Sequence, residues 1–229
     1  SEDSGNPLRR EKHARFFCRP LLQKSAENGG EAVLKHNTVE SFGIRSGERK
    51  MKAIGVLPED YGEIYSLNLQ KDKRTAIIVN LLALAIAAVM AVSMNFFVPV
   101  TSVFDMSGGI VRYFLRLAAL IVLMVLYMVL HELVHGIAMK LCGTKRVKYG
   151  FTGLYAFAGS EDYYDKKSYI FIALAPIVLW GTVLAAVNFF VPTEWFWIVY
   201  MIQLINISGA AGDLFAAVKF SRMPKNILI

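Results

Sequence analysis

Three ionisable residues with the spacing of a metal site interrupt an apolar run, in the segment YMVLHELVHGIAMK at 127–140. His131 and His135 are four residues apart, so a helix places both imidazoles on one face with their Cβ atoms ~6 Å apart. This spacing lets both rings reach one zinc ion. Glu132 follows the first histidine and is placed to act as a general base toward water rather than as a further ligand. The segment therefore predicts a zinc-dependent hydrolytic site.

An alternative interpretation is a helix end at a membrane surface that carries isolated histidines and a glutamate. Apolar residues flank the motif on both sides. A charged group at the centre of a bilayer costs ~2.5–3.5 kcal/mol on insertion scales. Because a metal site would explain why the chain accepts that cost, we prefer the metal-site interpretation.

A third metal ligand is predicted in the last apolar stretch of the chain. Catalytic zinc sites usually have three protein ligands, and the segment NISGAAGDLF contributes Asp213. If Lys140 and Lys219 mark the membrane surface, His131, His135 and Asp213 lie at depths of ~14, ~8 and ~9 Å. The three side chains can therefore meet, and we predict them as the metal ligands. The alternative for Asp213 is a helix cap or a surface carboxylate.

Asn206 is a candidate substrate-binding residue. It precedes Asp213 by seven residues, so a helix places both on nearly the same face. Its amide could donate to a substrate carbonyl or to a ligand, and an inter-helix structural hydrogen bond is an equal alternative. The small residues at 208–212 would let helices pack closely at this point.

The elements that must position these residues are long apolar stretches. A bilayer core of ~30 Å needs ~20 apolar helical residues, and the chain offers four such stretches. We predict an all-α polytopic membrane protein whose transmembrane helices span approximately 76–98, 110–141, 168–191 and 196–218.

Basic residues predict the orientation of these helices. Lys and Arg gather before the first stretch, between the second and third, and after the fourth, whereas the opposite loops at 99–109 and 192–195 contain none. We therefore expect a multi-pass membrane protein with both termini in the cytoplasm. Arg112 and Arg116 are expected to extend toward lipid headgroups. The net charge of +7 is accounted for by this topology and by contact with the bilayer, and nucleic acid is not an expected partner.

Outside the apolar helices we predict three further features. Residues 1–50 are polar and are interpreted as a disordered or non-native leader, with Met51 as the native start. Residues 51–75 form a cytoplasmic pre-membrane segment, and 76–229 form a four-helix metalloprotease-like domain. In KYGFTGLYAFAG at 148–159, aromatic residues alternate as in a strand, which predicts a short cytoplasmic β-hairpin between helices two and three. An interfacial aromatic anchor is the alternative.

These residues resemble the site-2 protease clan of intramembrane zinc metalloproteases. The chain is also similar to a family of bacterial membrane proteins described as zincin peptidases, in LPEDYGEIYSLNLQKDK, HELVHG and NISGAAGDLFAAVKFSRMPKN. The resemblance runs from Leu57 to the C-terminus. It implies His131, His135 and Asp213 as zinc ligands and Glu132 as the catalytic base.

The resemblance also implies a function and a mode of substrate binding. The expected activity is hydrolysis of peptide bonds in membrane-associated protein or peptide substrates, with the hairpin pairing to an unwound substrate. One departure concerns the Asn-Pro stretch and Asp-Gly pair of site-2 proteases, since here Gly212 precedes Asp213 and no proline is present. The alternative function is a non-catalytic metal-binding membrane protein, such as a pseudoprotease or a sensor. A transporter is disfavoured because helices one and three carry only neutral polar groups.

Overall fold

The structure is a computed structural model that describes residues 20–24, 53–56, 61–66, 72–151, 156–224 and 227–229. Its helices are α1 (Lys73–Asn95), the 3-10 helix η2 (Val100–Phe104), α2 (Ile110–Leu141), α3 (Lys166–Phe190), α4 (Thr193–Gly209) and α5 (Ala211–Ser221). Its strands are β1 (Pro20–Lys24), β2 (Tyr61–Ser66), β3 (Lys148–Phe151), β4 (Ala156–Gly159) and β5 (Ile227–Leu228).

Four helical segments are long and apolar enough to cross a membrane, judged by length and composition: α1, α2, α3 and the combined α4–α5 segment. The predicted helical fold with four such segments is confirmed to this extent. Apolar side chains on the outside of the bundle remain exposed, as Leu84 (66%) and Val122 (64%) illustrate. Exposed apolar surface of this extent is typical of a face that meets lipid.

Helix α1 begins three residues before its predicted start because Asp72 caps it. The Asp72 carboxylate accepts hydrogen bonds from the backbone N–H groups of Arg74 and Thr75. Side-chain oxygens of aspartate satisfy the free N–H groups of a first helical turn in this way. The boundary is therefore determined by a local cap rather than by where the apolar run begins.

The fourth predicted span is confirmed as one segment long and apolar enough to cross a membrane, but it consists of two helices, α4 and α5, where one continuous helix was expected. Helix α4 ends at Gly209, and Ala210 has φ −84° and ψ 17°, outside the α-helical region. The ladder of α5 then begins with the Leu214 N–H donating to the Ala210 carbonyl at 3.0 Å. Ala210 and Ala211 are almost completely buried. Small residues allow the backbone to turn where helices pack closely.

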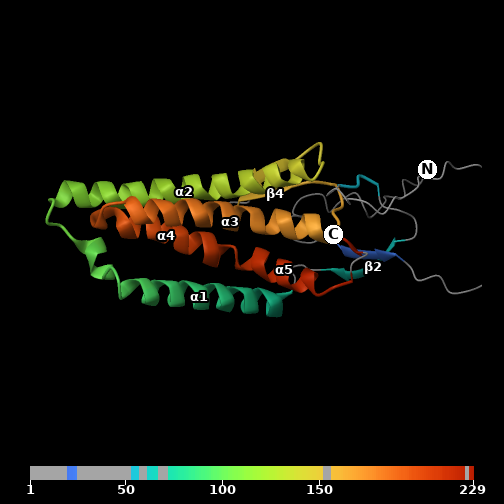
Figure 1. Ribbon diagram of the computed structural model, residues 1–229, viewed down its shortest axis with the longest axis horizontal. Coiled ribbons are helices and arrows are strands. Elements are labelled where there is room, and N and C mark those ends of the chain that lie inside the picture. Colours follow the sequence, from blue (N-terminus) through green and yellow to red (C-terminus); the bar gives the residue numbers. More distant parts are fainter. Residues whose placement is uncertain (1–19, 25–52, 57–60, 67–71, 152–155, 225–226) are drawn as a thin grey trace, which may run out of the picture.

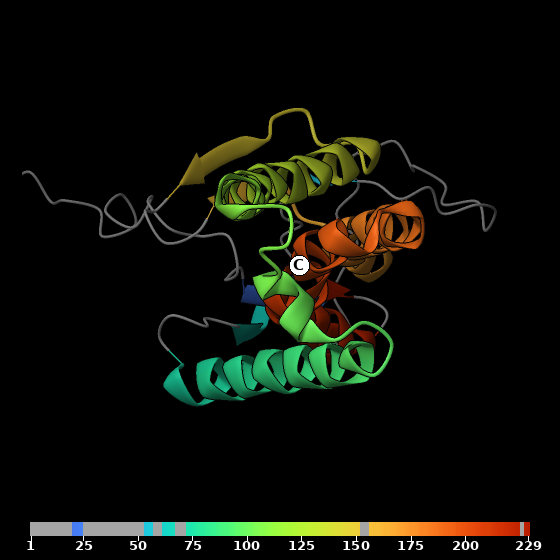
Figure 2. The same cartoon turned by 90° about the vertical axis from the view of Figure 1, so that its left-hand side faces the viewer.

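The bundle places α1 and α2 on opposite sides of α3, α4 and α5 (Figures 1 and 2). α1 packs on α4 and α5, whereas α2 packs on α3 and α4. The strand pair β3–β4, strand β2 and the C-terminus lie at one end of the bundle, and the connection from α1 to α2 lies at the other (Figure 1). The buried core clusters lie at the end that carries the strands; one contains Ala138, Met139, Cys142, Tyr164 and Ile172.

A glycine at the end of α2 directs the chain into the hairpin. Gly143 has φ +96°, a left-handed conformation that glycine adopts without strain. Its N–H donates to the Lys140 carbonyl at 2.9 Å, and the Thr144 N–H donates to the Met139 carbonyl at 3.1 Å. This pair of bonds is a Schellman motif. The chain therefore turns back along α2 immediately after the segment that carries the two histidines.

The predicted hairpin is confirmed as the antiparallel pair β3–β4, in which Tyr149 is opposite Ala158 and Gly150 is opposite Phe157. Tyr155, part of the predicted alternation, lies outside the described residues. A second sheet has the order β2-β1-β5. Its strand β1 lies within the predicted leader at 1–50, whose other residues lie outside the described part of the chain, so the leader and the three-part division of the chain stay predictions.

Arg116 differs from its predicted role at the far end of α2. Its side chain is buried, at 4% exposure, and donates to the backbone carbonyls of Glu194 and Asp105 instead of extending toward lipid headgroups. Neighbouring Arg112 remains exposed and lies 3.6 Å from the Glu194 carboxylate. Arg116 thus ties the connection before α2 to the start of α4.

Candidate metal centre

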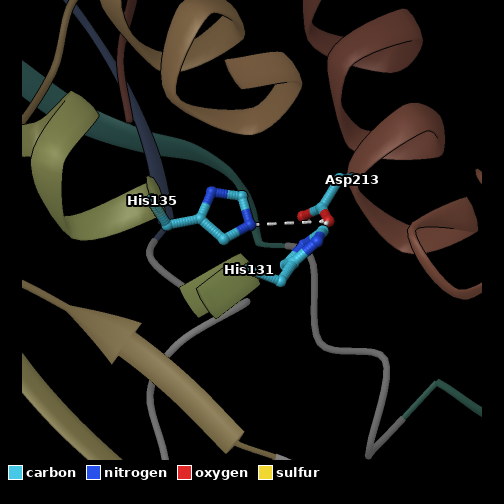
Figure 3. A group of neighbouring side chains, drawn as sticks. All are labelled: His131, His135 and Asp213. Carbon is cyan, nitrogen blue, oxygen red and sulfur yellow. Dashed lines mark ion pairs between the residues drawn. The ribbon is translucent and has the colours of Figure 1, made fainter. Parts of the chain in front are cut away.

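Helix α2 carries two imidazoles that face one carboxylate on α5. The Nε2 atoms of His131 and His135 each lie 3.7 Å from Oδ2 of Asp213. Figure 3 shows the three side chains converging from the two helices. Their exposed fractions are only 12%, 8% and 11%. The sequence-predicted ligand set is therefore brought together in a shielded site.

The break at Ala210 determines where Asp213 lies. Asp213 is in the first turn of α5, and its carboxylate is directed at the face of α2 that carries the histidines. A carboxylate is favoured near a helix N-terminus because the backbone dipole and free N–H groups there are positive. The small, buried residues around the break let this turn approach closely.

The donor set fits a zinc ion. Donor atoms of a tetrahedral zinc site lie ~3.3 Å apart, given Zn–N distances of ~2.0–2.1 Å. In the structure the donor atoms of His131, His135 and Asp213 all lie within 4.8 Å of one another. The separation of 3.7 Å between each Nε2 and the carboxylate is longer than a hydrogen bond. Two imidazoles and one carboxylate are also a ligand combination known for catalytic zinc.

Nδ1 of His131, the ring nitrogen that does not face Asp213, is held by a chain of hydrogen bonds across three helices. Its Nδ1 lies 2.7 Å from the Tyr127 hydroxyl. That hydroxyl donates to Oδ1 of Asn206 at 2.9 Å, and Nδ2 of Asn206 donates to the Ile177 carbonyl at 3.3 Å. Since the hydroxyl has a single proton, which it gives to Asn206, the His131 Nδ1–H must donate to Tyr127. The lone pair of Nε2 then faces Asp213.

His135 is oriented in the same sense by the backbone of α3. Its Nδ1 lies 2.9 Å from the Ile172 carbonyl, an acceptor that requires a proton on Nδ1. In their neutral form both histidines therefore present an unprotonated Nε2 to the site. Hydrogen bonds of this kind fix the tautomer of a metal-ligating histidine and strengthen it as a ligand.

Glu132 lies beside the donor set and contacts the hairpin. Its Oε2 accepts a hydrogen bond from the Ala158 backbone N–H at 2.8 Å. On the same helix face Gly136 leaves room for Tyr149, since a Cβ at Gly136 would lie 2.6 Å from Cζ of the Tyr149 ring. The hairpin therefore rests on α2 one turn beyond Glu132 and fixes the position of its carboxylate.

Asn206, predicted to bind substrate, is completely buried in the described structure. Both ends of its amide have partners on other helices, Tyr127 on α2 and Ile177 on α3. This placement matches the inter-helix alternative, and contact with substrate stays a prediction. Tyr127 itself was missed by the sequence analysis, although it precedes His131 by four residues and so lies on the same face.

Comparison with known proteins supports a class for the site. A family model described as "Putative zincin peptidase" matches residues 123–228, the part of the chain that holds His131, Glu132, His135 and Asp213. No curated protein and no solved structure matches the chain. The family match supports a zincin-like metallopeptidase, and it implies zinc as the cofactor.

Proposed function

We propose that this chain is an intramembrane zinc metallopeptidase that hydrolyses peptide bonds of membrane-associated proteins. The observation that carries the proposal is the convergence of His131, His135 and Asp213, with Glu132 next to them and outside the ligand pairings. A set of ligands together with a base is what metal-assisted hydrolysis needs. The resemblance to site-2 proteases supports the same assignment.

Each residue has a defined role in this proposal. His131, His135 and Asp213 would hold the zinc ion, which, when bound, supplies Lewis acidity to polarise a carbonyl and to acidify water. Glu132 accepts a proton from the attacking water and later delivers it to the leaving amine. The Ala158 N–H keeps the Glu132 carboxylate pointed toward the hairpin side of the site.

The hairpin is the proposed substrate-binding element. The Ala158 N–H donates to Glu132 on α2, so this part of β4 faces the catalytic side of the bundle. An extended substrate that added to β4 as a further strand would lie beside Glu132 with its peptide carbonyls accessible. A substrate helix would have to unwind first, because its carbonyls are already hydrogen bonded within the helix.

The proposed setting is the bacterial cell membrane, with the site near the cytoplasmic surface and both termini in the cytoplasm. The charge distribution along the sequence supports this orientation. Glu132 is hydrogen bonded to Ala158 of β4, and β4 lies toward the end of the bundle that carries the strands (Figure 1). Water from the cytoplasm would need to cross only the shallow part of the bundle.

The test combines metal content and proteolysis. Zinc per chain is measured in detergent-purified wild type, Glu132→Ala, Asp213→Ala and the control Glu194→Ala, and cleavage of β-casein in the same detergent is followed by mass spectrometry. We expect about one zinc in all but Asp213→Ala. Cleavage should fall ~10²–10⁴-fold in Glu132→Ala, the range for loss of a general base. Wild type without zinc would refute the proposal. Wild type that binds zinc but shows no Glu132-dependent cleavage would be a non-catalytic metal protein.

A further inference from the structure

A proline inside α3 leaves one backbone carbonyl of that helix without its usual partner. Pro176 lies in the middle of α3 and is fully buried. In an α-helix the N–H of each residue donates to the carbonyl four residues earlier. Proline has no N–H and its ring presses against that carbonyl. For Pro176 the carbonyl in question belongs to Ile172.

The carbonyl that Pro176 releases is the one that binds a proposed zinc ligand. The Ile172 oxygen accepts from Nδ1 of His135 at 2.9 Å, across the interface between α2 and α3. The contact is buried, since His135 and Ile172 are 6% and 5% exposed. With a residue that has an N–H at position 176, the imidazole would compete with the helix for this oxygen. The proline therefore makes the acceptor available to His135.

We propose that Pro176 is a positioning residue of the metal centre, and this inference rests on the proposed zinc site. It acts through the Ile172 carbonyl, which holds the proton on Nδ1 of His135 and so keeps the Nε2 lone pair directed at Asp213. Helix α3 contributes no ligand of its own among the described residues. It nevertheless ends both chains of hydrogen bonds, because the Ile177 carbonyl accepts from Asn206 at 3.3 Å on the path to His131.

A purely structural role for Pro176 and a positioning role predict different metal affinities for Pro176→Ala. Alanine is favoured over proline in a helix interior, because alanine restores the backbone hydrogen bond. If Pro176 served only to fill the core, Pro176→Ala would change metal affinity no more than another substitution that opens a void in the same core. If Pro176 positions His135, the variant should lose metal affinity while its fold is as stable as before or more stable.

The experiment measures zinc affinity by competition with a chelator in detergent-purified, full-length wild type, Pro176→Ala and Met139→Ala. Met139 is 3% exposed and lies in the same core cluster as Ile172, so Met139→Ala opens a void at the α2–α3 interface without altering a hydrogen bond to His135. Pro176→Gly, which also restores the N–H, is a second variant with the same expected effect. Thermal unfolding of the metal-free proteins reports on the fold.

¹⁵N NMR reports the tautomer of His135, which a change in packing alone would not alter. The chain has four histidines, so selective ¹⁵N-histidine labelling gives a simple spectrum. In metal-free wild type and Met139→Ala, His135 should show a single Nδ1–H tautomer. In Pro176→Ala it should show a mixture of the two tautomers.

We expect the zinc Kd of Pro176→Ala to rise ~10–100-fold, the usual effect of losing a partner of a metal-ligating histidine, and that of Met139→Ala to stay near wild type. An unchanged Kd and tautomer in Pro176→Ala would overturn this inference and leave the proposed function standing. Equal loss of affinity in both variants would also overturn it, because packing would then explain the loss. Wild type that binds no zinc would instead refute the proposed function and this inference with it.

Discussion

Removing the hydroxyl group of Tyr127 should weaken zinc binding without altering the shape of the site. The ring of Tyr127 packs edge-on against His131 and Trp180, with centroid distances of 5.6 and 6.4 Å, and Tyr127→Phe keeps these contacts. What the substitution removes is one oxygen that makes two hydrogen bonds, at 2.7 Å with His131 and 2.9 Å with Asn206. The side chain is only 7% exposed, so water does not readily replace that oxygen.

The two lost hydrogen bonds should appear in different measurements. Asn206 loses a donor in both the metal-free and the zinc-bound protein, so that loss lowers the free energy of unfolding but leaves zinc affinity unchanged. Side-chain hydrogen bonds between membrane helices contribute ~0.6 kcal/mol on average and ~1.7 kcal/mol at most. His131 loses the acceptor that fixes its tautomer, and such a loss raises a zinc Kd ~10–100-fold. That change equals ~1.4–2.8 kcal/mol of binding free energy.

The assay is zinc competition with a chelator, together with thermal unfolding of the metal-free protein. Tyr200→Phe is the matched control, because Tyr200 is also 7% exposed and its hydroxyl donates to the Met90 carbonyl at 3.0 Å, away from the donor set. Both variants should lose stability, and Tyr127→Phe alone should lose zinc affinity. Equal zinc Kd values in the two variants would refute the role assigned to the Tyr127–His131 bond.

Two further substitutions test the hairpin and the start of α1. Gly136→Ala would place a methyl group against the ring of Tyr149, 2.6 Å from its Cζ, so the Tyr149 side chain must move away from α2. Cleavage should fall while zinc content stays at wild type, and unchanged cleavage would contradict a role for this contact in positioning the hairpin. Hydrogen bonds from Thr75 lower the pKa of Asp72 below its ordinary value of 3.8. The Asp72 cap therefore stabilises α1 above that pH and is lost as the pH falls through the lowered pKa. The protection of the first turn of α1 against hydrogen exchange, measured relative to the intrinsic exchange rate at each pH, should fall at low pH in wild type but not in Asp72→Asn.

The convergence of His131, His135 and Asp213 was predictable because it depends on distances along helices. The four-residue spacing of His131 and His135 is a local property, and the depth of Asp213 follows from counting residues to Lys219. Both estimates hold whatever the order in which the helices pack. The hairpin was predictable for a similar reason, since alternating aromatic residues report on a strand directly.

The residues that orient the ligands were not predicted, because their partners lie far away in sequence. Pro176 appears in the sequence only as an interruption of an apolar run, and its importance depends on which helix faces the Ile172 carbonyl. Asn206 was assigned to substrate on the same grounds that fit a structural bond, and only the packing shows both ends of its amide engaged. The break at Ala210 was missed because alanine and glycine fit either a continuous or a broken helix.

The donor set comes from two separate helices, so zinc binding would also contribute to the stability of the fold. His131 and His135 belong to α2 and Asp213 belongs to α5. Helix α2 packs mainly against α3 and α4, whereas α5 packs mainly against α3 and α1. A zinc ion at the site would thus cross-link two helices that pack mainly against other helices. Binding to the folded state alone stabilises it by ~2.7 kcal/mol when free zinc is 100 times the Kd. Zinc at that concentration would therefore stabilise the fold in addition to supplying the chemistry proposed for the site.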